Sequence, residues 1–116
     1  MFAYKDKTDK YGITHRSYFL TQGDSFSIVG TPAENYADSV TNIKFRLAVG
    51  LDEFYTQDFA KQEDGRWVLL VDSASTAKWE VSEEPYTYEI EVYLLGDNSK
   101  TVAQADFTVW GQIKED

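Results

Sequence analysis

The chain has 116 residues and a formal net charge of −9, because 20 residues are Asp or Glu and 11 are Lys or Arg. Its apolar content of 42% is enough for one hydrophobic core, so we expect a folded domain rather than a disordered chain. The absence of cysteine excludes disulfides and thiolate metal sites, and an acidic chain without a basic stripe argues against a nucleic-acid partner.

No membrane or export signal stands out. No apolar run approaches the ~20 residues of a membrane span. The stretch from Met1 to Asp6 lacks the apolar continuation of a signal peptide. We therefore expect a protein made in the cytoplasm that has no membrane partner.

The chain begins with a polar stretch and then changes to a period of two. Residues 1–15 lack sustained periodicity, which predicts an irregular N-terminal arm. Strands are expected at 16–21 and 25–30, and Pro32 should end the second because proline cannot donate to a ladder. Residues 41–50 form the clearest early strand. Its expected inward row is Ile43, Phe45, Leu47 and Val49.

The middle of the chain is less regular. Residues 51–65 fit either a strand or a short helix. Residues 66–72 are apolar in both phases, which is typical of a strand covered on both faces. Residues 73–78 should form one helical turn or a crossing between sheets.

The strongest alternation lies in a final hairpin over 86–94 and 103–109. A four-residue turn at 97–100 would pair Gly96 with Thr101.

That register places Ile90 opposite Phe107, and it places Glu91 opposite Asp106. The second pair brings two like charges together, which is mildly destabilising.

Several short strands without long helices predict an all-β antiparallel sandwich of six or seven strands. The domain should cover 16–110, with the arm at 1–15 before it and a tail at 111–116 after it.

Four short motifs follow one another along this domain. They are QGDSFSI at 22–28, IKFRL at 43–47, WVLLV followed by SAST at 67–76, and YTYEIEV at 86–92 with the closing DFTV at 106–109. Together they resemble the immunoglobulin-like β-sandwich domains of tailed-phage virion proteins, such as the N-terminal domain of baseplate upper proteins and head- or tail-fibre modules.

The resemblance implies an immunoglobulin-like fold and a non-enzymatic structural role in a phage virion. The protein would be a capsid-decoration protein or a tail or baseplate accessory, made in the host cytoplasm. Its partners would be other virion proteins or a second copy of itself. Two alternatives stay open, namely a carbohydrate-binding or host-adhesion module and an acidic inhibitor that mimics nucleic acid.

Five residues are predicted to contact a partner: Trp67, Tyr93, Trp110, Glu91 and Asp106. The three aromatics are chosen because Trp and Tyr anchor interfaces. In the carbohydrate alternative, Tyr93 and Trp110 form one exposed flat platform. The two acids either receive Lys44 and Arg46 from the strand at 41–50, or bind a basic partner or calcium.

No catalytic residue, cofactor or metal site is predicted. Any histidine-dependent triad would have to use His15, and nothing marks a carboxylate pair with separated pKa values. The acidic pairs at 52–53, 63–64 and 83–84 are interpreted as solvated turns, because calcium requires about six to eight converging oxygens.

Overall fold

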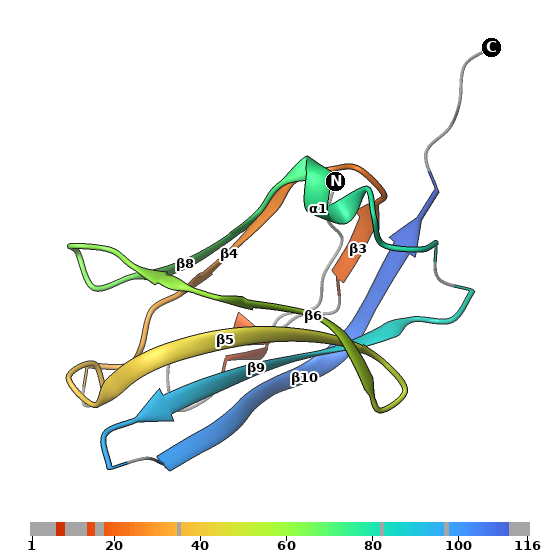
Figure 1. Ribbon diagram of the computed structural model, residues 1–116. Coiled ribbons are helices and arrows are strands. Elements are labelled where there is room, and N and C mark those ends of the chain that lie inside the picture. Colours follow the sequence, from red (N-terminus) through yellow and green to blue (C-terminus); the bar gives the residue numbers. More distant parts are fainter. Residues whose placement is uncertain are drawn as a thin grey trace.

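Two β-sheets pack face to face in the computed structural model (Figure 1). The structure describes residues 7–8, 14–15, 18–34, 36–81, 83–96 and 98–111. One sheet has five strands in the order β3 (Tyr18–Thr21), β10 (Asn98–Trp110), β9 (Tyr86–Leu94), β5 (Val40–Val49) and β6 (Asp52–Asp58). The other has three strands in the order β4 (Phe26–Gly30), β8 (Trp67–Val71) and β7 (Ala60–Lys61).

The predicted all-β sandwich is therefore confirmed, with eight strands in its two sheets where six or seven were expected. All pairings within it are antiparallel except that of β3 with β10. Among the described residues, no helix is long and apolar enough to cross a membrane.

The two chain ends are described only in part. Within the predicted arm at 1–15, β1 (Lys7–Thr8) and β2 (Thr14–His15) pair as a short antiparallel ribbon. The rest of the arm lies outside the described residues, as does the tail at 111–116 except for Gly111.

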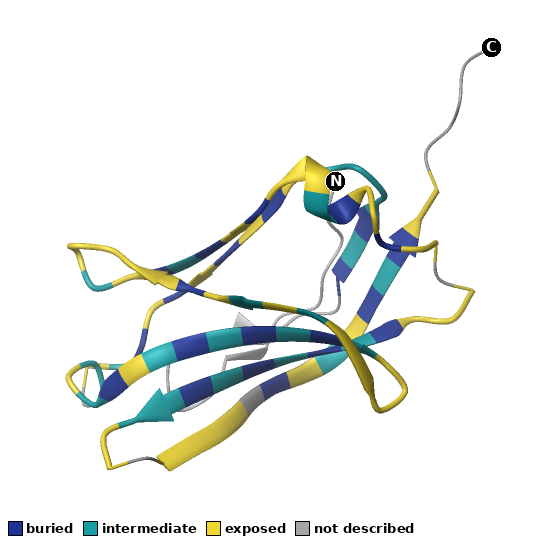
Figure 2. Ribbon diagram, in the orientation of Figure 1, coloured by how far each residue is buried: buried dark blue, intermediate teal, exposed yellow. Residues whose placement is uncertain are grey.

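The alternation of apolar and polar residues along the strands explains which side chains lie on the inner faces of the sheets. On β9 and β5 every second residue is buried between the sheets, and the residues between them face outward (Figure 2). The buried residues of these strands are Ile43, Phe45, Leu47, Tyr88, Ile90 and Val92. Val49 was expected in the same row but is exposed, because β5 extends past the core where it turns into β6.

The strand order is that of an immunoglobulin-like domain. The strands β4, β8 and β7 take the places of strands B, E and D, and β5, β9 and β10 take those of C, F and G. A single-turn helix, α1 (Ser73–Thr76), begins the connection between β8 and β9, and the Asp72 side chain accepts a hydrogen bond from the Ser75 amide at 2.8 Å. At the start of β9, the Tyr86 hydroxyl donates to the Glu80 carbonyl at 2.5 Å, which is the tyrosine corner of such domains.

Interlocked aromatic rings fill the space between the sheets. Phe107 lies at the centre of this cluster, with ring centroids 5.5 Å from Phe26, 5.8 Å from Trp79 and 5.7 Å from Tyr18. The rings meet at tilted or edge-to-face angles, which are the preferred geometries of aromatic pairs. Because the chain has no cysteine, these rings link the two sheets where many immunoglobulin domains have a disulfide.

The register predicted for the final hairpin is wrong by four residues. Ala103 pairs with Ile90, and Phe107 pairs with Tyr86 instead of Ile90. The loop lies between Leu94 and Asn98 and so comes earlier than predicted.

An irregularity between Thr101 and Ala103 then restores the inward phase of β10. A shift of four residues leaves every side chain on its original face, so the apolar pattern alone does not distinguish the two registers.

The segment at 51–65 passes from one sheet to the other. It forms β6 beside β5 and then β7 beside β8, and the Phe59 amide donates to the Ile43 carbonyl at 2.8 Å between them. The strand alternative for this segment is thus confirmed. The crossing closes one side of the sandwich, where the Gln57 side-chain Nε2 donates to the Leu70 carbonyl at 2.7 Å.

Replacing Phe107 with Ala should lower the free energy of unfolding by about 3–5 kcal/mol, because it removes the ring at the centre of the cluster. Trp110→Ala is the matched control, since Trp110 lies three residues further along β10 on the outer face and is 55% exposed. It should cost about 1 kcal/mol or less. Urea unfolding followed by tryptophan fluorescence and circular dichroism measures both, and equal costs would contradict this description of the core.

Candidate functional site

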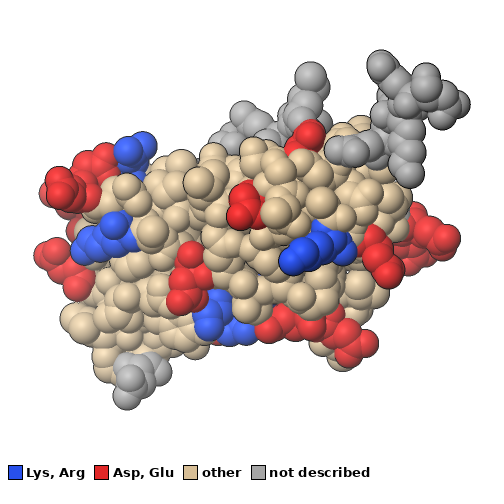
Figure 3. All heavy atoms as spheres, turned by 45° about the horizontal axis from the view of Figure 1, so that its top comes forward, with Lys and Arg blue, Asp and Glu red and all other residues tan. Residues whose placement is uncertain are grey.

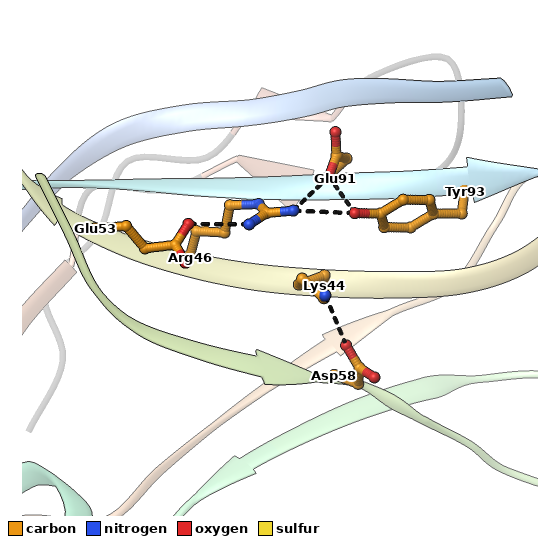
Figure 4. A network of polar contacts seen from close by, with 6 residues as sticks. All are labelled: Lys44, Arg46, Glu53, Asp58, Glu91 and Tyr93. Carbon is orange, nitrogen blue, oxygen red and sulfur yellow. Dashed lines mark hydrogen bonds and ion pairs between the residues drawn. The ribbon is translucent and has the colours of Figure 1, made fainter. Parts of the chain in front are cut away.

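A polar network lies on the outer face of the five-stranded sheet, over three of its strands (Figure 4). Arg46 on β5 donates to Glu53 and to Glu91, each at 2.9 Å, and to the Tyr93 hydroxyl at 3.0 Å. The Tyr93 hydroxyl in turn donates to Glu91 at 2.5 Å. These residues come from β5, β6 and β9, so the network fastens three neighbouring strands together.

The electrostatics of the network favour its charged state. The hydrogen bond from Tyr93, and after it that from Arg46, lowers the pKa of Glu91 below its ordinary value. The pKa of Tyr93 is raised, chiefly because its hydroxyl donates to Glu91. The pKa of Arg46 is raised by its two carboxylate partners, so the guanidinium stays charged.

The network corrects the expected pairing of charges. The strand at 41–50 does lie beside β9, and Arg46 does reach Glu91 as predicted. Glu91 and Asp106 are not opposed, however, because the altered register places Thr101 opposite Glu91 and Thr87 opposite Asp106.

Lys44 faces Asp58 on β6, with its side-chain nitrogen 3.8 Å from the carboxylate oxygen.

The alternative that the two acids bind calcium gains no support from the structure. The described residues contain no cluster of three or more His, Asp or Glu side chains suited to a metal ion.

The three predicted contact aromatics lie far apart. Trp67 is only 6% exposed, because it shares the inward phase of β8 with Leu69 and faces Gly30 across the ladder. Trp67 is therefore buried in the isolated chain, whereas Trp110 is exposed, and a contact of Trp67 with a partner stays a prediction.

Tyr93 and Trp110 do not form one platform. Tyr93 pairs with Ser99, and Trp110 lies eleven residues further along β10, a separation of about 35 Å along the strand. Trp110 contacts Phe19 instead, with ring centroids 5.5 Å apart. Of the five predicted contact residues, the structure brings together only Glu91 and Tyr93, and their role in binding a partner stays a prediction.

A groove of about 330 Å³ opens at the end of the sandwich where β5 turns into β6. Its lining residues are Val49, Asp52, Glu53, Phe54, Lys78, Trp79, Glu80 and Tyr86. Phe54 is 42% exposed, and its ring stands edge-to-face against Tyr86, with centroids 4.9 Å apart. The groove thus has an aromatic floor and a charged rim.

A β-bulge places Phe54 in this groove. Tyr55 pairs with Leu47 and Glu53 pairs with Ala48, so Phe54 is the extra residue between them. The bulge lets Glu53 face outward to Arg46 while Phe54 meets Tyr86. One local irregularity therefore serves both the polar network and the groove.

The other wall of the groove is the connection from α1 to β9. The Gln22 side-chain amide donates to the Trp79 carbonyl at 2.6 Å, and the Tyr86 hydroxyl holds the Glu80 carbonyl. Burial, and after it the negative charge of Glu80, raises the pKa of Tyr86, so its hydroxyl keeps its proton as a donor. These contacts hold the wall in place.

The groove could not be predicted from the sequence. Phe54 and Tyr86 are 32 positions apart, and only the pairing of β5 with both β6 and β9 brings them together. The sequence did carry one signal at Gly50, which adopts a φ of 60° in the two-residue turn before β6.

The comparisons with known proteins show a fold but no family. No family model matches the sequence, and no curated protein matches it. Among solved structures, the pullulanase SAP of Group B Streptococcus matches 70% of this chain with a TM-score of 0.50 and 13% identity. A putative glycoside hydrolase from Bacteroides vulgatus ATCC 8482 matches 83% with a TM-score of 0.51 and 12% identity.

Extracellular domains 3–5 of Drosophila OTK match 96% of the chain at 10% identity, with a TM-score of 0.43. The chain spans 10%, 17% and 36% of the lengths of these three proteins, in that order. Identities this low show the fold alone, a β-sandwich module like those within larger proteins. Neither of the two bacterial enzymes is a phage protein, so the resemblance to virion domains gains no support from them beyond the fold.

Replacing Glu91 with Gln should reduce the free energy of unfolding by about 1 kcal/mol at neutral pH. The lowered pKa of Glu91 means that its carboxylate stabilises the fold above the pKa of the unfolded chain. That contribution is lost as the pH falls through the lower pKa of the folded state.

Denaturant unfolding of the wild type and the variant should therefore converge in acid. Asp106→Asn is the control, because Asp106 has no ion pair among the described residues. It should change stability little at either pH. A wild-type advantage over Glu91→Gln that persists unchanged in acid would show that the network does not act through this carboxylate.

Proposed function

We propose that this protein is a non-catalytic carbohydrate-binding module that holds its ligand in the groove beside Phe54. The observation that carries the proposal is an exposed aromatic ring in a concave site whose rim bears Asp52, Lys78 and Glu80. The volume of about 330 Å³ lies within the range of small-ligand sites.

Each part of the groove has a role in this proposal. The exposed face of Phe54 packs against the apolar C–H face of a pyranose ring, as aromatic side chains provide rigid contact area. The carboxylates of Asp52 and Glu80 accept hydrogen bonds from sugar hydroxyls, and the Lys78 ammonium donates to ring or hydroxyl oxygens. Tyr86 supports Phe54 from the side, so the floor is formed before the ligand arrives.

The fold comparisons support a role as an accessory module. Two enzymes whose names refer to polysaccharide or glycoside cleavage contain a region with this fold. The chain corresponds to only 10% and 17% of their lengths, which suits a domain that binds rather than one that carries out the reaction. The proposal therefore includes no catalytic step.

Phe54→Ala should weaken oligosaccharide binding by at least about tenfold, since a central aromatic contact typically contributes more than 1 kcal/mol to binding. An oligosaccharide array with neutral, acidic and amino sugars would select ligands, and titration calorimetry would measure them. Thermal unfolding checks that the variant still folds.

Trp110→Ala is the control for this variant, because Trp110 is also an exposed aromatic but lies outside the groove. It should leave binding unchanged. Loss of binding in Trp110→Ala but not in Phe54→Ala would move the site away from the groove and contradict the proposal.

A second candidate function is docking to another protein, in the setting that the sequence resemblance implies, a phage virion. One observation favours docking: the outer face of the three-stranded sheet has no charged side chain among its outward positions. These positions are Ser27, Val29, Ala60, Val68 and Leu70. In Figure 3, many acidic groups lie toward the two ends of the face shown, and isolated acidic and basic groups interrupt the tan surface between them.

If the chain docks in a virion, purified phage particles should contain a fixed number of copies of it. Mass spectrometry of such particles measures this number. Val29→Glu should reduce incorporation, because Val29 is 48% exposed on the uncharged face. Val81→Glu is the matched control, since Val81 is 49% exposed elsewhere. Absence of the chain from particles, or normal incorporation of Val29→Glu, would count against docking through this face.

A further inference from the structure

More acidic than basic side chains surround the groove. The connection from α1 to β9 carries Glu80, Glu83 and Glu84 but only one cation, Lys78. Asp52 adds a further carboxylate from the opposite wall. Glu53, the remaining acid of the lining, is already paired with Arg46 and adds little to the excess. The end of the sandwich that holds the groove is therefore distinctly negative.

The aromatic floor of the groove, like its acidic rim, attracts positively charged groups. The faces of aromatic rings carry negative charge density and attract cations held within about 6 Å of the ring centre. Phe54 is 42% exposed and can present such a face to a ligand. Tyr86 turns toward it at an interplanar angle of 65°, so the two rings form a corner rather than a flat surface.

From this charge complementarity we infer that the groove takes an amino sugar whose amine is protonated, within an oligosaccharide of glucosamine type. The inference rests on the proposed function and narrows it to one ligand class. The ammonium group would lie between the Phe54 face and the carboxylates of Asp52 and Glu80, while the pyranose ring stacks as described above. An N-acetylated or unmodified sugar keeps the stacking but loses the ionic attraction.

Three β-1,4-linked hexamers test the inference because they differ mainly in the substituent at C2. They are the hexamers of glucosamine, N-acetylglucosamine and glucose, titrated calorimetrically at a pH where the free amine is protonated. The glucosamine hexamer should bind roughly fivefold or more tightly than either neutral hexamer, as one exposed ion pair allows. The ratio should shrink as salt is raised.

Two charge-matched double variants separate the groove from the general acidity of the protein. Asp52→Asn with Glu80→Gln should weaken binding of all three hexamers, because both carboxylates accept hydrogen bonds from sugar hydroxyls, but it should reduce the preference for glucosamine over the neutral hexamers to near one. Glu34→Gln with Glu63→Gln removes the same charge from loops at the other end of the sandwich, on the left in Figure 1, and should leave the preference intact.

The outcomes distinguish the two proposals. If no oligosaccharide binds, the proposed function fails. If neutral hexamers bind through Phe54 but glucosamine has no advantage, only the narrower inference is overturned. If both double variants reduce the preference equally, the attraction belongs to the whole acidic surface, and the inference is overturned as well.

Discussion

Contact between the ring of Phe26 and the rings of the opposite sheet is the interaction on which the sandwich depends. Phe26 on β4 lies 6.2 Å from Phe45 on β5 and 5.5 Å from Phe107 on β10. It also meets Trp79 at 5.9 Å, at the base of the groove wall. Because no disulfide joins the sheets, their spacing and relative position rest on this packing, and so does the groove at their end.

The bulge at Phe54 links the fold to the proposed site. In a regular strand, residues two apart point to the same face, so Glu53 could not point outward to Arg46 while Tyr55 pairs with the inward Leu47. The extra residue turns the strand locally and allows both. The Arg46 network then fixes Glu53, and the edge-to-face contact with Tyr86 fixes Phe54.

The fold could be predicted from the sequence more completely than the candidate site. The faces of β5 and β9 followed from alternation, because burial of one face requires a period of two. The register of the final hairpin did not follow, since shifts by an even number of residues preserve that alternation. The burial of Trp67 did not follow either, because β8 is apolar in both phases and only packing against the other sheet decides which phase is buried.

The amino-acid sequence by itself determined an acidic all-β sandwich with alternating strands, and it located Arg46 beside Glu91. These properties depend on local periodicity and on the order of the strands. Tertiary structure alone decided that Phe54, Tyr86 and Glu80 share one groove and that Tyr93 and Trp110 lie far apart. The reason is that these relations depend on strand register, on a bulge and on the path of a connection, and all three are set by packing between residues distant in the chain.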